Sequence, residues 1–134
     1  MKSIFATDFD GTLLRSDKTL CPEDISALLR LREAGAAAVL ATGRNPFSLF
    51  RAVGGVKLPF HWLILSSGAG MISEEGEVVT LGALSPGDVE TVRDFLEKNR
   101  LEYSVQGPFP DSHLLYADSN PRHPDHRVRQ GLYR

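Results

Sequence analysis

The stretch Asp8-Phe9-Asp10-Gly11-Thr12-Leu13-Leu14 follows a short apolar run, Ile4–Thr7, near the start of a chain of 134 residues. Such a run predicts a buried β-strand. Residues two apart on an extended segment face the same side, so we expect Asp8 and Asp10 to project together beyond the end of this strand. Gly11 allows a sharp turn there, and we expect it to leave backbone N–H groups facing an oxyanion.

The pattern that follows alternates helices with strands. The predicted elements are a helix over Pro22–Arg32, a strand over Ala36–Ala41, a helix opened by Asn45 and Pro46 with Phe47, Phe50 and Val53 at helical spacing, and a strand over His61–Leu65. This alternation predicts an α/β fold in which a parallel sheet is covered on both faces. The ligand site of such a sheet lies beyond the carboxyl ends of its strands.

The second half of the chain has a different pattern. It predicts a hairpin of Met71–Ser73 and Glu77–Leu81, a helix capped by Ser85 that runs to Arg100, two strands over Leu101–Gln106 and Leu114–Ala117, and a loop from Asp118 to His126. We expect the apolar stripe of that helix, formed by Val89, Val92, Phe95 and Leu96, to be core.

Composition excludes several classes of function. With 15 basic and 17 acidic residues the formal net charge is −2, which gives no overall field for binding nucleic acid or a membrane surface. No segment approaches the roughly 20 apolar residues that cross a bilayer. Cys21 is the single cysteine and the start of the chain does not resemble a signal peptide, so we expect a cytoplasmic protein.

Each of the three predicted parallel strands ends in polar residues: the acid pair Asp8 and Asp10, then Thr42-Gly43-Arg44, then Ser66-Ser67-Gly68. Two carboxylates that lie close together favour a cation between them, and Mg²⁺ takes one or two carboxylates together with a substrate phosphate. In phosphoryl transfer through an aspartyl phosphate, one carboxylate attacks phosphorus and a neighbouring acid protonates the leaving oxygen. Thr42 and Arg44 could then hold the phosphoryl oxygens or a nearby carboxylate.

At these residues the sequence resembles the haloacid dehalogenase superfamily of phosphohydrolases. Asp8–Leu14 matches its first motif, and Ala41-Thr42-Gly43-Arg44 matches its second motif in the form typical of the Cof-type, cap-bearing sugar phosphatases. The resemblance implies that residues 1–82 form the N-terminal part of a Rossmann-type core domain. Residues 83–134 would then be part of an α+β cap that covers the site and selects the leaving group.

The resemblance also implies roles for individual residues. Asp8 would be the nucleophile and a Mg²⁺ ligand, and Asp10 would be the general acid and base with its backbone carbonyl on the metal. The residues expected to bind the substrate and its phosphate are Gly11, Thr12, Thr42, Gly43, Arg44 and Ser67. Ser67 stands where the subfamily usually has asparagine.

Two further motifs of the family, a lysine and an acidic pair that completes the magnesium site, should follow the cap, and this sequence contains neither. We therefore expect an N-terminal fragment that holds Mg²⁺ weakly and has little activity by itself. Its first strand would also lack neighbours that the family supplies, which would leave an apolar sheet edge open to self-association.

Several functions remain open at this stage. The main hypothesis is a Mg²⁺-dependent phosphatase acting on a small phosphorylated metabolite such as a sugar phosphate. A phosphomutase uses the same intermediate, and a non-catalytic module that binds metal or phosphate would explain the missing motifs. A receiver-type signalling domain is disfavoured, because it needs an aspartate where this chain has Ser66.

Overall fold

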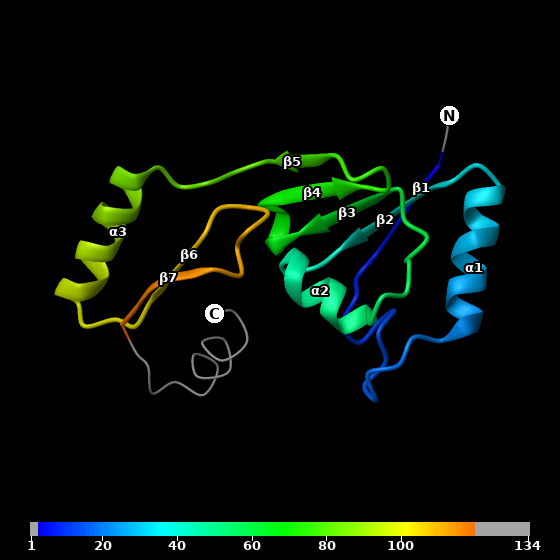
Figure 1. The fold of residues 1–134 in the computed structure, drawn as a ribbon, viewed down its shortest axis with the longest axis horizontal. Helices are drawn as coiled ribbons and strands as arrows, with labels where there is room; N and C mark the ends of the chain where they lie inside the picture. The colour runs from blue at the N-terminus through cyan, green and yellow to red at the C-terminus, as the bar shows by residue number, and fades with distance from the viewer. Residues whose placement is uncertain (1–2, 120–134) are drawn as a thin grey trace.

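The computed structural model describes residues 3–119, which form a five-stranded sheet flanked by two helices and a smaller two-stranded sheet with one helix (Figure 1). The elements of the larger part are β1 (Ile4–Thr7), α1 (Pro22–Glu33), β2 (Ala37–Ala41), α2 (Pro46–Val53), β3 (Trp62–Leu65), the short 3-10 helix η1 (Ser66–Gly68), β4 (Gly70–Ser73) and β5 (Val78–Thr80). The smaller part contains α3 (Pro86–Lys98), β6 (Ser104–Gln106) and β7 (Leu115–Asp118).

The larger sheet has the order β1-β2-β3-β4-β5. Its first three strands are parallel, with Phe5 opposite Ala38 and Val39 opposite Trp62, whereas β4 and β5 continue as antiparallel neighbours. The prediction of an α/β fold built on parallel strands is therefore confirmed. Because β1, β2 and β3 point the same way, the polar residues that follow them meet at one edge of the sheet.

The core lies around β2 and β3. Its fully buried members include Phe9, Ala38, Leu40, Leu49 and Leu65. In α2 the buried face consists of Pro46, Leu49 and Val53. The predicted helix is confirmed, but of the three apolar residues at helical spacing Val53 alone is on this face, since Phe47 and Phe50 are 37% and 50% exposed.

Strand β1 is an edge of the sheet. Among residues 3–119 it pairs with β2 alone, and the side chain of Ile4 is 74% exposed. The expectation of an apolar edge at the first strand is thus confirmed.

Helix α3 begins with a capping box, in which Ser85 accepts from the backbone N–H of Asp88 and the Asp88 carboxylate accepts from that of Ser85. The expected burial of its apolar stripe is wrong for Val92 and Phe95, and the latter is 62% exposed. A cavity of about 780 Å³ separates this helix from the β6–β7 hairpin, so the stripe is not closely packed.

The expected loop from Asp118 to His126 begins one residue later, since Asp118 ends β7, and from residue 120 on it lies outside the described residues. Within residues 3–119 no helix has the length and apolar character needed to cross a membrane.

Candidate active site at the strand ends

A polar cavity of about 560 Å³ lies at the carboxyl ends of β1, β2 and β3. Its lining residues are Asp8, Asp10, Thr42, Gly43, Arg44, Asn45, Ser48, Ser66, Ser67 and Gln106. The structure therefore brings together six of the eight residues that the sequence singled out, including both acids.

The two acids lie on either side of Phe9, just past the end of β1. The ring of Phe9 is fully buried in the core, whereas Asp8 and Asp10 on either side of it are exposed. An alternation of this kind places residues two apart on one face. Leu13 and Leu14 are also buried, so the rest of the segment anchors the turn that carries the acids.

Gly11 and Thr12 do not line the cavity, so their expected contact with a phosphate stays a prediction. The N–H of Gly11 donates to the carbonyl of Leu14 at 2.9 Å, and that of Thr12 donates to the carbonyl of Phe9 at 3.4 Å. Gly11 has φ +77°, a left-handed conformation that favours glycine. Its role here is to close the turn.

Arg44 forms a two-pronged ion pair with Asp10. Its Nε and Nη2 atoms donate to the two carboxylate oxygens, each at 2.7 Å. Nη1 donates to the carbonyl of Ser48 at 3.1 Å, and the guanidinium lies 5.3 Å from the centre of the Phe9 ring. The hydrogen bonds from Arg44 hold the pKa of Asp10 below its usual range, so Asp10 is ionised in this arrangement.

Thr42 is only 7% exposed and is fixed by its backbone, whose N–H donates to the carbonyl of Ile64 at 3.0 Å. Its hydroxyl oxygen accepts from the N–H of Arg44 at 3.2 Å. A hydroxyl that accepts one bond still has its proton to donate. Thr42 can therefore give a hydrogen bond to an anion in the cavity.

The turn after β3 carries Ser66 and Ser67 in left-handed conformations, with φ +51° and +55°. The N–H of Ser66 donates to the carbonyl of Arg44 at 2.8 Å, and that of Ser67 donates to the carbonyl of Thr42 at 3.3 Å. These bonds tie the third strand end to the second. Non-glycine residues in this conformation are uncommon and cluster at functional sites, which agrees with the position of the turn beside the acids.

The sequence did not single out Asn45, Ser48 or Gln106 for the site, and it named Ser66 among the polar residues after the third strand without giving it a role there. Asn45 caps α2 by accepting a hydrogen bond from the N–H of Ser48 at 2.8 Å. The helix start directly after the second motif is the sequence signal that could have placed Asn45 and Ser48 at the site. Gln106 ends β6, about 60 residues further along the chain. No local pattern indicates that it meets the acids.

The donor set of the cavity suits Mg²⁺. Asp8 and Asp10 supply hard oxygen ligands, and a protein commonly gives this ion one or two carboxylates while water and phosphate complete its shell. Residues 3–119 contain no cluster of three or more histidine, cysteine, aspartate or glutamate side chains that could hold a metal ion. Among the described residues, the carboxylates that this cavity could offer to a metal are those of Asp8 and Asp10, and that of Asp10 is paired with Arg44.

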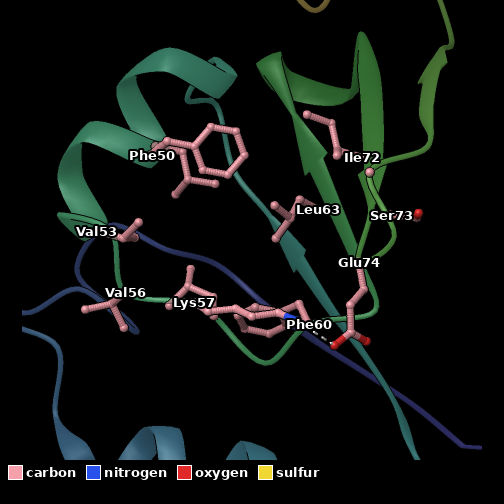
Figure 2. Close-up of a pocket in the computed structure, with 13 residues that line it drawn as sticks. Phe50, Val53, Val56, Lys57, Phe60, Leu63, Ile72, Ser73 and Glu74 are labelled. Carbon is pink, nitrogen blue, oxygen red and sulfur yellow. Dashed lines mark ion pairs between the residues drawn. The ribbon is translucent and has the colours of Figure 1, made fainter.

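A second cavity, of about 380 Å³, lies between α2 and strands β3 and β4 (Figure 2). Apolar side chains such as Phe50, Phe60 and Leu63 form most of its wall. Its charged rim consists of Lys57 and Glu74, 3.5 Å apart from nitrogen to oxygen. Ser73 gives this cavity one hydroxyl, but it has neither the paired acids nor the threonine and arginine of the strand-end cavity, so the latter is the candidate active site.

Comparison with known proteins agrees with this geometry. A family model described as haloacid dehalogenase-like hydrolase matches residues 5–129. An HMP-PP phosphatase from Klebsiella pneumoniae is 36% identical over 92 residues, which are 69% of this chain and 34% of that protein. The chain thus spans about a third of the length of this relative.

Solved structures show the same likeness. A haloacid dehalogenase-like hydrolase from B. subtilis is 30% identical, with a TM-score of 0.62, and the match covers 78% of this chain and 36% of that one. A phosphatase of the same superfamily from Bacteroides thetaiotaomicron is 23% identical, with a TM-score of 0.67, and the match covers 80% of this chain and 39% of that one. The resemblance found in the motifs is confirmed: the protein belongs to the haloacid dehalogenase-like hydrolase family.

Proposed function

We propose that this chain carries the reacting carboxylates of a Mg²⁺-dependent phosphohydrolase that acts on small phosphorylated metabolites. The observation that carries the proposal is that Asp8, Asp10, Thr42, Arg44 and Ser67 all line one polar cavity. In this proposal residues 1–82 are the core that does the chemistry, residues 83–134 are the first part of a cap, and the protein works in the cytoplasm.

The proposed reaction has two steps. A carboxylate oxygen of Asp8 attacks phosphorus, the bond from phosphorus to the leaving oxygen breaks, and Asp10 gives that oxygen a proton. Water then attacks the phosphorus of the aspartyl phosphate, loses a proton to Asp10 and releases inorganic phosphate from Asp8. Thr42 and Ser67 would donate hydrogen bonds to the equatorial oxygens, where negative charge is spread in the transition state.

Mg²⁺, when bound by Asp8 and Asp10, would neutralise the phosphate so that a second anion can approach it. For Asp10 to give up a proton, it must also leave its ion pair with Arg44, which favours the ionised form. A phosphate group offers the guanidinium the same two-pronged geometry as a carboxylate. We infer that Arg44 exchanges Asp10 for the substrate phosphate.

The substrate class rests on the relatives and on the cavity. The Klebsiella relative is an HMP-PP phosphatase, and a cavity of about 560 Å³ has room for a phosphate with a small leaving group. We propose a sugar phosphate or a similarly small phosphorylated metabolite as the substrate.

The test is phosphate release by the chain with Mg²⁺ from HMP-PP and a panel of hexose phosphates. We expect Asp8→Asn to abolish release, whereas Asp94→Asn, an exposed aspartate of α3, should leave it unchanged. Acid-quenched wild-type chain should carry one phosphoryl group on the peptide that contains Asp8. Isomerised hexose phosphate in place of free phosphate would instead identify a phosphomutase.

Two results would overturn the proposal. One is phosphate release that survives in Asp8→Asn, which would exclude Asp8 as the nucleophile. The other is a folded wild-type chain that releases no phosphate from any member of the panel.

The ion pair between Arg44 and Asp10 favours a second candidate, a module that binds a phosphate group without transferring it. Both oxygens of Asp10 are engaged by Arg44, so the acid is not set up to protonate a leaving group. This candidate predicts that inorganic phosphate binds in calorimetry, that Arg44→Ala weakens binding, and that no phosphorylated compound is turned over.

A further inference from the structure

The loop of residues 107–114, which joins β6 to β7, extends from its own small sheet to the larger one (Figure 1). The ring of Phe109 packs against Gly70 at the start of β4, and the hydroxyls of Ser112 and Ser66 lie 2.9 Å apart. The ring of His113 stacks on that of Phe47 with 5.0 Å between centroids. The loop thus contacts the core at β4, η1 and α2.

Phe109 is the most deeply seated part of this loop. Its side chain is 5% exposed and joins the hydrophobic core cluster of the larger part. A Cβ added to Gly70 would collide with the Cγ, Cδ1 and Cε1 atoms of the ring. The φ of Gly70 lies outside the left-handed region, so its backbone would tolerate a side chain. The ring of Phe109 is what leaves no room for one.

Gln106 lies at the end of β6, where the docked loop begins. Gln106 immediately precedes the loop and lines the strand-end cavity together with Asp8, Asp10 and Ser66. Among the described residues from 83 to 119, only Gln106 lines this cavity. Its amide offers donors and an acceptor, which suit the hydroxyl groups of a leaving group rather than the phosphate itself.

We propose that the contact of Phe109 with Gly70 is a latch that holds the loop on the core and thereby positions Gln106 against the leaving group. Phe109 is then a positioning residue, and Gln106 is a specificity-determining residue. The part that concerns substrate rests on the proposed phosphohydrolase function, whereas the docking of the loop does not.

The test uses three variants and a matched control. Gly70→Ala should expel the Phe109 ring, Phe109→Ala should remove it, and the double variant should be no worse than Phe109→Ala, because both changes break one contact. Gly82→Ala is the control, since a Cβ there meets no atom within 4 Å. Circular dichroism checks that each variant retains the fold.

The first measurement is hydrogen exchange of the backbone amides over residues 104–118. We expect about tenfold faster exchange in Gly70→Ala and Phe109→Ala, and no change in Gly82→Ala. Two results would overturn the latch. One is a folded Gly70→Ala variant whose amide exchange is unchanged, and the other is a double variant in which the effects of the two substitutions on exchange add. This measurement needs no activity, so its failure is distinct from failure of the proposed function.

The second measurement separates the leaving-group contact from the phosphate contact. In Gly70→Ala, Phe109→Ala and Gln106→Ala, the KM for a hexose phosphate should rise about fivefold, the size of one lost hydrogen bond. The inhibition constant of inorganic phosphate should stay the same, because the proposal assigns Gln106 to the leaving group and not to the phosphate. Equal changes in both constants, or no change in KM, would overturn the specificity role of Gln106.

Discussion

At the scale of single residues, the site depends on where Arg44 directs its guanidinium. The carbonyl of Ser48 and the face of the Phe9 ring hold the group beside the acids, and two of its N–H groups donate to the carboxylate of Asp10. The guanidinium can bind a phosphate in place of a carboxylate. Arg44 is therefore expected to matter more for substrate affinity than for folding.

Arg44→Ala tests this expectation. The Asp10 side chain is 45% exposed, so loss of the ion pair should lower the free energy of unfolding by only about 0.2–1 kcal/mol. The KM for the substrate should rise by more than tenfold, roughly the value of one charge-assisted pair. Urea denaturation and steady-state kinetics give the two quantities, with Arg51→Ala on the exposed side of α2 as the control. A large loss of stability with KM unchanged would show that Arg44 is structural.

At the scale of elements, much could be predicted because the signals are local. Helix starts are marked by Pro22, by Asn45 with Pro46, and by Ser85 with Pro86 and Asp88, and the three α-helices within residues 3–119 begin at those prolines. The spacing of Phe47, Phe50 and Val53 predicted the helix α2 but not its buried face, since periodicity alone does not say which of two apolar stripes meets the sheet.

The capping box of α3 gives a prediction for that element. Ser85→Ala removes the acceptor for the N–H of Asp88, so helix α3 should lose about 1 kcal/mol of local stability. Faster amide exchange within residues 86–98 would report this loss. Thr91→Ala, in the middle of the same helix, is the matched control. Equal exchange in the Ser85→Ala variant and the wild type would mean that the cap contributes nothing.

Glu74 connects the β4–β5 turn to α1 and makes folding sensitive to pH. Two hydrogen bonds from Arg32, at 2.6 and 3.2 Å, hold the pKa of Glu74 below its usual range, and Lys57 acts in the same direction. A carboxyl group whose pKa is lower in the folded state stabilises the protein above its unfolded pKa, about 4.3 for glutamate. That contribution is lost as the pH falls through the lower, folded pKa.

The expected result is a wild-type unfolding free energy that drops on acidification below about pH 5 more steeply than that of Glu74→Gln. Urea titrations at a series of pH values measure both slopes. Glu75→Gln, at the exposed neighbouring position, should follow the wild type. Identical slopes in wild type and Glu74→Gln would show that the ion pair does not contribute.

At the scale of the whole molecule, the sequence predicted the strand-end residues but not how the smaller part meets them. Asp8, Thr42 and Ser67 follow three parallel strands, so the topology alone brings them together. Gln106 and Phe109 reach the core through a loop whose path depends on tertiary contacts with Gly70 and Ser66. No periodicity or turn signal encodes such contacts, and they had to come from the structure.

The exposed edge of the larger sheet should make the chain self-associate. Strand β1 pairs only with β2 among residues 3–119, and exposed Ile4 and Phe5 make its surface apolar. An unpaired apolar edge is a template for another chain, and lysine is the residue that natural edges use against such pairing. Ile4→Lys should therefore reduce self-association, measured by sedimentation velocity at rising protein concentration.

The side chain of Ile4 is 74% exposed, so this substitution should change the free energy of unfolding by no more than roughly 0.5 kcal/mol. Leu29→Lys, on the exposed face of α1, adds the same charge away from the edge and should associate like the wild type. If both lysine variants lose association equally, net charge rather than edge pairing governs it. A wild-type chain that stays monomeric at every concentration would show that β1 is not an associating edge, whatever the exposure of its side chains.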